Sequence, residues 1–283
     1  MKLFDNHNHS QFSFDGKRTS IRESALSAFE KGLSGICFTD HCDFFVPPMK
    51  AMHEDLASEV FDVEAQQQET DRVNAEFHSL RTAEGDPFRI FKGIEIGVQK
   101  SCREQIRKHL STHCFDQIIA SVHYLDDTDP FYGGYYEGKD WKTAYGHYLE
   151  TLYEEMVWLG KDFDIMGHYD YVARYAPYPK SSIFYRDFSD IFDAMLKFLA
   201  QEGKALEINT KTYKDYNGRI PVLDTDILKR FREFGGEAVS LGSDSHDAGR
   251  TGDDFMKYVQ IIKNAGFKYS AHFESRKLCM TAV

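Results

Sequence analysis

Short apolar or β-branched stretches that end in polar residues recur along the 283-residue chain. Seven of them are predicted to be β-strands, at residues 3–6, 35–39, 90–96, 117–122, 164–166, 205–208 and 238–241. Between most of them the apolar residues repeat with helical period. Helices are predicted from Thr19 or Ser20 to Lys31, with Gly32 ending the helix, and at residues 60–81, 145–159, 188–200 and 225–234.

Strands that alternate with helices about every 40 residues favour a parallel sheet with crossover helices. Seven such units suit an α/β barrel that closes on itself, or nearly so, in one domain. A doubly wound open sheet is the alternative fold. In a barrel, functional side chains gather where strands end, at the carboxyl rim. The strands are followed by, or end on, His7, His9, Asp40, His41, Glu95, His123, His168, Glu207, Asn209, Asp244 and His246.

Two pairs of polar residues, at the first and last predicted strands, point to a metal site. Side chains two apart in an extended strand face the same side, so His7 and His9 can bind one ion. Asp244 and His246 repeat this spacing after the seventh strand. A closed barrel brings these two strands together, so we expect the two pairs to meet.

The middle strands supply further candidates. Glu95 lies within an apolar strand, where an unpaired carboxylate is costly, so it needs a cation: a metal ion, or alternatively a lysine or arginine. Imidazole nitrogen with carboxylate oxygen suits zinc, iron(II) or manganese. The candidates are too many for one tetrahedral ion and suffice for two or three, which could activate a bridging hydroxide. They are His7, His9, Asp15, His41, Glu95, His123, His168, Asp244 and His246.

Composition narrows the classes of protein. With 42% hydrophobic and 28% charged residues the chain is globular, and its net charge of −11 disfavours nucleic acid and anionic membranes as partners. No apolar run is long enough to span a membrane, and the first residues do not resemble a signal peptide. Five cysteines without a C-x-x-C pair predict free thiols and a cytoplasmic location.

The order of motifs resembles the PHP superfamily, named for polymerase and histidinol phosphatase. The matching elements are D-N-H-N-H-S at residues 5–10, T-D-H at 39–41, G-I-E-I at 93–96, S-V-H at 121–123, G-H-Y-D at 167–170 and S-D-S-H at 243–246. Within the superfamily the chain is similar to the stand-alone histidinol-phosphate phosphatases. It has their length, no fused polymerase, and a G-H-x-D-x-x-x-R-Y stretch at 167–175.

The resemblance implies a distorted (β/α)7 barrel, a site for three metals, and hydrolysis of L-histidinol phosphate to L-histidinol and phosphate in histidine biosynthesis. It assigns His7, His9, Glu95 and Asp244 to the first metal. Glu95 would bridge to a second metal held by His123 and His168, and Asp15, His41 and His246 would hold the third. Many relatives have histidine where this chain has Asp15, which leaves the identity of the third metal open.

A phosphate substrate also needs cationic side chains. Arg174 and Arg250 follow the fifth and seventh strands at the expected rim, and a guanidinium can grip phosphate oxygens in a bidentate manner. Hydroxide attack in line on phosphorus, with the arginines stabilising the equatorial oxygens, is the expected mechanism.

Three other functions compete with this prediction. An amidohydrolase-type C–N hydrolase shares the H-x-H strand and the late aspartate, and a PHP-type phosphatase or phosphoesterase could act on nucleotides. A non-catalytic barrel with a structural or regulatory metal is the third. The expected partner is a small phosphorylated molecule, and the sequence leaves the oligomeric state open.

Overall fold

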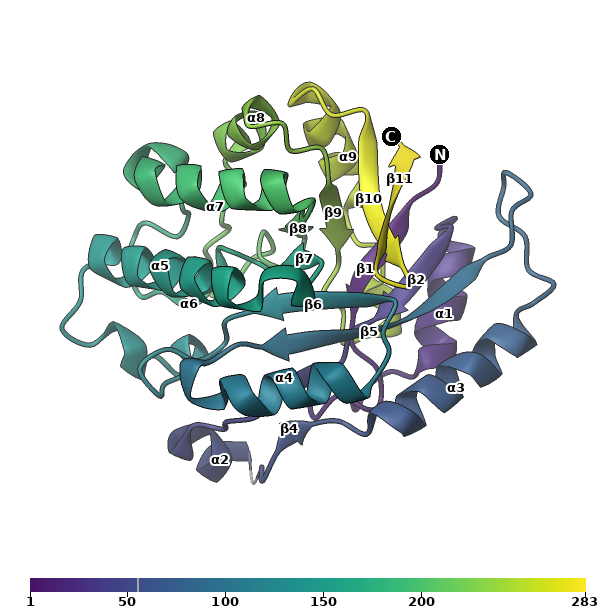
Figure 1. Ribbon diagram of the computed structural model, residues 1–283, viewed down its shortest axis with the longest axis horizontal. Helices are drawn as coiled ribbons and strands as arrows, with labels where there is room; N and C mark the ends of the chain where they lie inside the picture. Colours follow the sequence, from purple (N-terminus) through teal and green to yellow (C-terminus); the bar gives the residue numbers. More distant parts are fainter. Residues whose placement is uncertain (55) are drawn as a thin grey trace.

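The computed structural model describes residues 1–54 and 56–283 and is a mixed α/β structure, with helices outside a mainly parallel sheet (Figure 1). The strands are β1 (Phe4–Asn8), β2 (Gly35–Phe38), β3 (His41–Asp43), β4 (Glu59–Val60), β5 (Arg89–Gly97), β6 (Gln117–Ser121), β7 (Ile165–Met166), β8 (Ala205–Asn209), β9 (Val239–Gly242), β10 (Tyr269–Glu274) and β11 (Lys277–Ala282). The α-helices are α1 (Ile21–Glu30), α2 (Pro48–Glu54), α3 (Val63–Glu76), α4 (Arg103–Thr112), α5 (Trp141–Leu159), α6 (Tyr171–Tyr175), α7 (Ser189–Glu202), α8 (Thr225–Glu233) and α9 (Phe255–Asn264).

All seven predicted strands are present, as β1, β2, β5, β6, β7, β8 and β9, and their ends differ from the prediction by no more than about two residues. They lie in this order in the sheet, and each pairs with the next in parallel. A doubly wound sheet would reverse its strand order near the middle. The sequential order therefore excludes the alternative fold, and the carboxyl ends of all seven strands share one edge.

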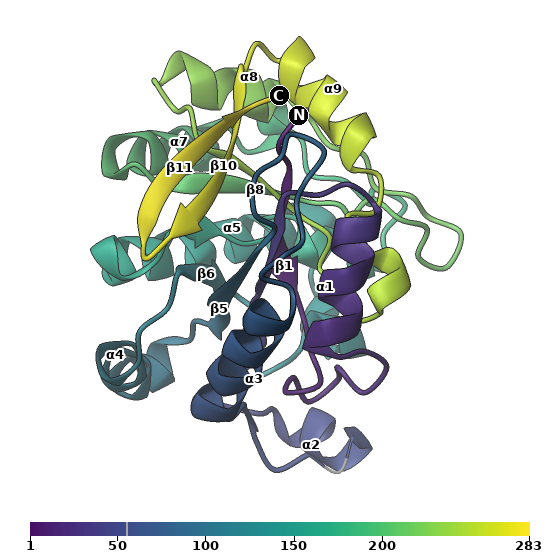
Figure 2. The ribbon, with the colours of Figure 1, turned by 90° about the vertical axis from the view of Figure 1, so that its right-hand side faces the viewer.

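The expected closure of the barrel was wrong, because within the described residues β1 and β9 form no ladder. β10 pairs with β9 instead, through Ala271 and Ser240, and β11 extends the sheet antiparallel to β10 (Figure 2). In place of a ladder, the side-chain amide of Asn6 connects β1 to its neighbours. Its Nδ2 atom donates to the carbonyl oxygens of Leu241 (3.2 Å) and Ala271 (3.0 Å).

Although β1 and β9 form no ladder among the described residues, the segments at their carboxyl ends are hydrogen-bonded to each other. The Asp244 amide donates to the His7 carbonyl (2.8 Å), and the His9 amide donates to the Ser245 carbonyl (2.9 Å). The polar residues at the two ends of the sequence are therefore neighbours, although the ladder between the strands is incomplete.

Capping residues explain where the helices begin. The Ser20 side chain accepts from the Glu23 amide and starts α1, as predicted. The helix predicted at residues 60–81 is shorter, because β4 takes residue 60 and the Asp62 side chain caps α3 at the Ala65 amide. Asp140 caps α5 at the Thr143 amide, so that helix begins at Trp141 rather than at residue 145.

The apolar core fills the space between the sheet and its helices. Ile21 and Ala25 of α1 and Tyr148 and Leu152 of α5 are completely or almost completely buried against it. The five cysteines form no disulfide. Among the described residues, no helix combines the length and the apolarity needed to cross a bilayer.

Candidate metal centre

The Glu95 carboxylate lies at the centre of a cluster of histidines at the carboxyl edge of the sheet, and it is fully buried. Its Oε1 atom lies 3.1 Å from His123 Nε2 and 2.9 Å from His168 Nε2. Its Oε2 atom lies 3.2 Å from His7 Nε2 and 2.9 Å from His41 Nδ1. The two oxygens therefore face two different groups of imidazoles, which is the geometry of a carboxylate that can bridge two ions.

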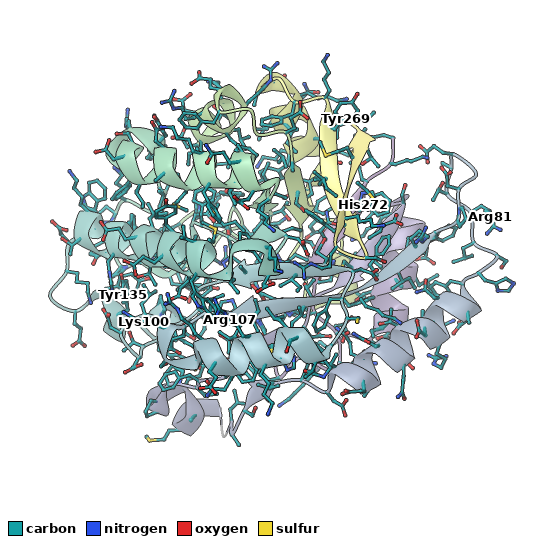
Figure 3. All side chains as sticks on the ribbon, viewed as in Figure 1. Arg81, Lys100, Arg107, Tyr135, Tyr269 and His272 are labelled. Atoms are coloured by element: carbon teal, nitrogen blue, oxygen red, sulfur yellow. The ribbon has the colours of Figure 1, made fainter. Side chains whose placement is uncertain are left out.

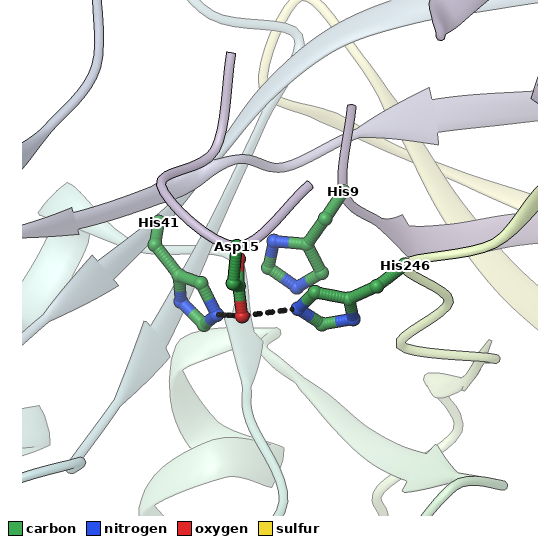
Figure 4. Close-up of side chains that lie close together, drawn as sticks. All are labelled: His9, Asp15, His41 and His246. Carbon is green, nitrogen blue, oxygen red and sulfur yellow. Dashed lines mark ion pairs between the residues drawn. The ribbon is translucent and has the colours of Figure 1, made fainter. Parts of the chain in front are cut away.

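A second group lies beside the first, and His9 joins the two. His9 Nε2 is 3.5 Å from Glu95 Oε2 and 3.3 Å from Asp244 Oδ1. Asp15 Oδ2 lies 2.8 Å from His246 Nε2 and 3.7 Å from His41 Nε2 (Figure 4). One ligand atom from each of His9, Asp15, His41 and His246 falls within 4.8 Å of the others. The structure thus brings all nine candidate ligands into one connected cluster.

Glu95 Oε1 accepts hydrogen bonds within the cluster, but several other ligand atoms lie close together without forming one. His7 Nε2, His9 Nε2, His41 Nδ1 and Glu95 Oε2 are buried, and none makes a hydrogen bond within the described residues. Buried polar atoms without partners each cost about 1–3 kcal/mol. Divalent ions shared between the imidazole nitrogens and the carboxylate oxygens would satisfy these atoms, so the cluster fits two or three metal ions.

The electrostatics of the cluster are mixed. Burial disfavours the charged forms of His7 and His41, but the Glu95 carboxylate more than compensates and raises the pKa of both, so each would release a proton on binding a metal ion. Burial alone would raise the pKa of Glu95, but the surrounding imidazoles, above all His7, hold it well below its usual value. Burial, together with neighbouring His246 and His41, lowers the pKa of His9. An ionised carboxylate and a neutral imidazole are the forms that bind a metal ion.

Outer carboxylates orient two of the imidazoles. His7 Nδ1 lies 2.6 Å from Glu207 Oε1, and the other oxygen of Glu207 accepts from the His168 amide (2.7 Å). His123 Nδ1 lies 3.0 Å from Asp43 Oδ2. A carboxylate behind a histidine ligand fixes its tautomer and increases its basicity. Glu207 was predicted at the rim, but its partnership with His7 was not.

Glu207→Gln is expected to weaken metal binding 10- to 100-fold while the protein stays folded. A glutamine side chain still fills the space but carries no charge to support the His7 imidazole. Metal affinity measured with a competing chelator checks this. An unchanged affinity would show that Glu207 does not act through His7.

Gly242, at the end of β9, lets this arrangement pack closely. A Cβ atom at residue 242 would lie 2.4 Å from Glu207 Oε1 and 2.5 Å from the Cβ of His7. Asp244, two residues on, has a φ of 47°, a strained value for a residue with a side chain. The chain therefore turns sharply here and presents Asp244 to His9.

A cavity of about 670 Å³ opens above the cluster. Its lining includes Asp15, His41, His123, His168, Asp244 and His246, together with the cationic residues Lys17, Arg18, Lys50, Arg174, Lys211 and Arg250. Six carboxylates line the same cavity, so the cations would favour an anionic ligand locally rather than through a net positive charge.

The two predicted arginines differ in their contacts. Arg174 donates from Nη1 to the carbonyl oxygens of Lys211 (2.5 Å), Thr212 (3.0 Å) and Lys214 (3.2 Å), so it braces the loop after β8. Its Nε atom is buried and has no hydrogen-bond partner among the residues that the structure describes. Arg250 is more exposed, and its Nε lies 3.6 Å from Asp253. Both line the cavity.

Lys211 was missed by the sequence analysis. Its Nζ lies 2.9 Å from Asp244 Oδ1 and 3.3 Å from His246 Nδ1. Burial opposes its charged form, but Asp244 more than compensates and raises the pKa of Lys211. A lysine in a loop has no distinctive pattern, and only its closeness to Asn209 at the end of β8 could have drawn attention to it.

Comparison with known protein families identifies the family of this chain. The PHP domain matches residues 5–211, which is more than half of the chain. The chain belongs to the PHP domain family. Histidinol-phosphatase from Lactococcus lactis is 34% identical over 279 residues, covering 98% of this chain and 97% of the relative. A probable histidinol-phosphatase from Clostridium acetobutylicum is 29% identical over 274 residues, covering 97% and 98% of the two chains.

Two solved structures share the fold of this PHP protein. The crystal structure of histidinol phosphate phosphatase from Lactococcus lactis, complexed with zinc, L-histidinol and phosphate, superposes with a TM-score of 0.83 at 32% identity and covers 98% of this chain and 99% of its own. A putative histidinol phosphatase from Listeria monocytogenes has a TM-score of 0.69 at 17% identity, with coverage of 90% and 99%, and supports the fold alone.

Proposed function

We propose that the protein is a metal-dependent phosphomonoesterase that hydrolyses L-histidinol phosphate to L-histidinol and phosphate in histidine biosynthesis. The observation that carries the proposal is the likeness, over almost the whole of both chains, to the Lactococcus histidinol phosphatase complexed with zinc, histidinol and phosphate. The cluster around Glu95 and the lysines and arginines that line the cavity above it support the same chemistry.

The nine clustered residues are proposed to hold two or three zinc, iron(II) or manganese ions. His7, His9, Glu95 and Asp244 would take one ion, Glu95 with His123 and His168 a second, and Asp15, His41 and His246 a third. When bound, such ions lower the pKa of water toward neutrality and so provide the nucleophile for attack on phosphorus.

The side chains that line the cavity are proposed to position the substrate. Lys211 and the two arginines, Arg174 and Arg250, would bind the phosphate and stabilise the charge that develops on its oxygens. Glu59 and Asp129 line the same cavity. Lys50 Nζ lies 2.8 Å from Glu59 and 3.4 Å from Asp129, so the three residues together would offer one uncompensated negative charge to the imidazole or amine of histidinol.

The whole chain is proposed to form one PHP-type metallophosphoesterase domain, residues 1–283. Its sheet is proposed to be a distorted, open form of a (β/α)7 barrel, with no ladder between β1 and β9 among the described residues. A cytoplasmic location is proposed from the five free thiols and from the biosynthetic role.

Steady-state kinetics on protein loaded with zinc, manganese or iron test the substrate. We expect kcat/KM for histidinol phosphate to exceed that for a nucleoside monophosphate by at least about tenfold, which is about 1.4 kcal/mol of transition-state binding. A tenfold preference for the nucleotide would overturn the substrate assignment but not the phosphatase. Hydrolysis of an amide or cyclic imide without phosphatase activity would overturn both.

Arg174→Ala is expected to raise KM about tenfold or more with a smaller change in kcat, because it removes a cation and loosens the loop that carries Lys211. Arg219→Ala is a matched control, since Arg219 donates to the Ala176 and Tyr178 carbonyls but does not line the cavity. Wild-type kinetics in the Arg174 variant would contradict the phosphate-binding role.

A further inference from the structure

The β10–β11 hairpin carries a second group of potential metal ligands, far from the carboxyl edge of the sheet. His272 lies on this hairpin (Figure 3). In the antiparallel pair it lies opposite Cys279, and Glu274 is two residues beyond it on the same strand. Directly opposed residues, and residues two apart, point to the same face of a sheet. One ligand atom from each of His272, Glu274 and Cys279 falls within 4.8 Å of the other two.

This group is separate from the Glu95 cluster. The His272 ring stacks on Phe4, with ring centroids 3.8 Å apart and planes 12° apart, and it also contacts Phe91. Phe4 and Phe91 lie at the amino ends of β1 and β5, whereas His7, His9 and Glu95 lie toward the carboxyl ends of the same strands. The hairpin group therefore lies near the amino ends of the parallel strands, whereas the cavity lies at their carboxyl ends.

The His272 imidazole is buried with part of its bonding capacity unused. The residue is 4% exposed, and its Nδ1 atom has no hydrogen-bond partner within the described residues. Its Nε2 atom makes a long contact of 3.4 Å to Glu274 Oε1.

The Glu274 carboxylate is held with one oxygen toward the histidine. Oε2 accepts from Arg89 at 3.2 Å, which leaves Oε1 facing His272. Arg89 in turn lies over the Phe91 ring, with its guanidinium carbon 5.2 Å from the ring centroid. An outer cation that holds one carboxylate oxygen fixes the direction of the other, as outer partners do for metal ligands.

We propose that His272, Glu274 and Cys279 form a second binding site for zinc or a similar thiophilic divalent ion. A thiolate with an imidazole and a carboxylate suits zinc and excludes magnesium and calcium. Binding would release the thiol proton to solvent and leave a fourth position for water. The bound ion would join β10 to β11 and would stabilise the hairpin without taking part in hydrolysis.

Cobalt(II) substitution tests the site, because a thiolate bound to cobalt gives an ultraviolet charge-transfer band that oxygen and nitrogen ligands do not give. The ligands of the Glu95 cluster contain no sulfur, so this band would report on the hairpin alone. We expect the band in the wild-type protein titrated with cobalt, and its loss in Cys279→Ser. Cys114→Ser, which changes an exposed free cysteine elsewhere, should keep the band.

Metal content and activity give independent readings. We expect Cys279→Ser to bind one zinc equivalent fewer than wild type by elemental analysis, with kcat for histidinol phosphate unchanged within about twofold. His272→Ala should also bind one zinc equivalent fewer than wild type. If truncation of this buried histidine prevents folding, Cys279→Ser still tests the site. A thiolate band that is absent from the wild type, or that persists in Cys279→Ser, would overturn the site whatever the phosphatase activity.

Discussion

Glu95→Gln is expected to lower kcat for histidinol phosphate by at least about 10³-fold, equivalent to roughly 4 kcal/mol. The carboxylate faces His123 and His168 with one oxygen and His7 and His41 with the other, so a neutral amide would weaken both groups at once. The amide has nearly the same shape, so the fold should be kept. Steady-state kinetics and elemental analysis of the same sample measure the two effects.

Glu155→Gln is the matched control for this variant. Glu155 is also a buried glutamate, 3% exposed, but it pairs with Arg103 at 2.9 and 3.0 Å and lies outside the metal cluster. We expect it to reduce stability slightly and to leave kcat and metal content unchanged. A Glu95→Gln protein that keeps full metal content and more than about a tenth of wild-type kcat would contradict the bridging role.

Removal of metal ions by a chelator is expected to abolish hydrolysis and to lower the thermal midpoint by about ten degrees or more. An ion present at about 1,000 times its dissociation constant contributes about 4 kcal/mol per site to the free energy of unfolding. Without ions, buried ligand atoms such as His9 Nε2 and Glu95 Oε2 have no hydrogen-bond partner in the part of the chain that the structure describes. Calorimetry and an activity assay on the same chelated sample test both effects.

Adding back zinc, iron(II) or manganese should restore activity and the thermal midpoint together, whereas magnesium should restore neither. Protein dialysed against the same buffer without chelator is the control for handling losses. Full activity in a sample that elemental analysis shows to be free of these metals would exclude the proposed mechanism. Loss of the fold without phosphatase activity at any metal content would favour a structural role for the metals.

Much of the parallel sheet could be predicted because its strands are short apolar runs that end in polar residues. The positions of His123 and His168 after β6 and β7 follow from that pattern. The parallel order then places these ends along one edge, so distant motifs converge. The pairwise distances could not be predicted, because they depend on bends such as the turn at Asp244.

The β10–β11 hairpin escaped prediction because its turn lacks the usual residues. Ser275 and Arg276 have φ values of 49° and 64°, a conformation for which hairpins normally use asparagine or glycine. Without that turn signal, the residues on either side of it were not predicted to form two paired strands. Missing this hairpin also made the barrel appear closed, since β10 occupies the edge of β9 that β1 was expected to take.

Some site residues have no sequence signal of their own. Lys211 is an ordinary loop lysine until the fold places it 2.9 Å from Asp244. Asp43 likewise follows the T-D-H motif without any sign that it supports His123. Such outer contacts depend on which neighbouring loops face each other, and a single sequence does not contain that information.

The meeting of β1 with the loop after β9 has a consequence for how the protein matures. On the ribosome, His7 and His9 emerge first, but Asp244 and His246 follow more than 230 residues later. At typical elongation rates of about 5–20 residues per second that delay is on the order of ten seconds or more. The nascent chain therefore cannot assemble the full set of ligands during most of its synthesis, and complete metal loading must come after translation is nearly finished.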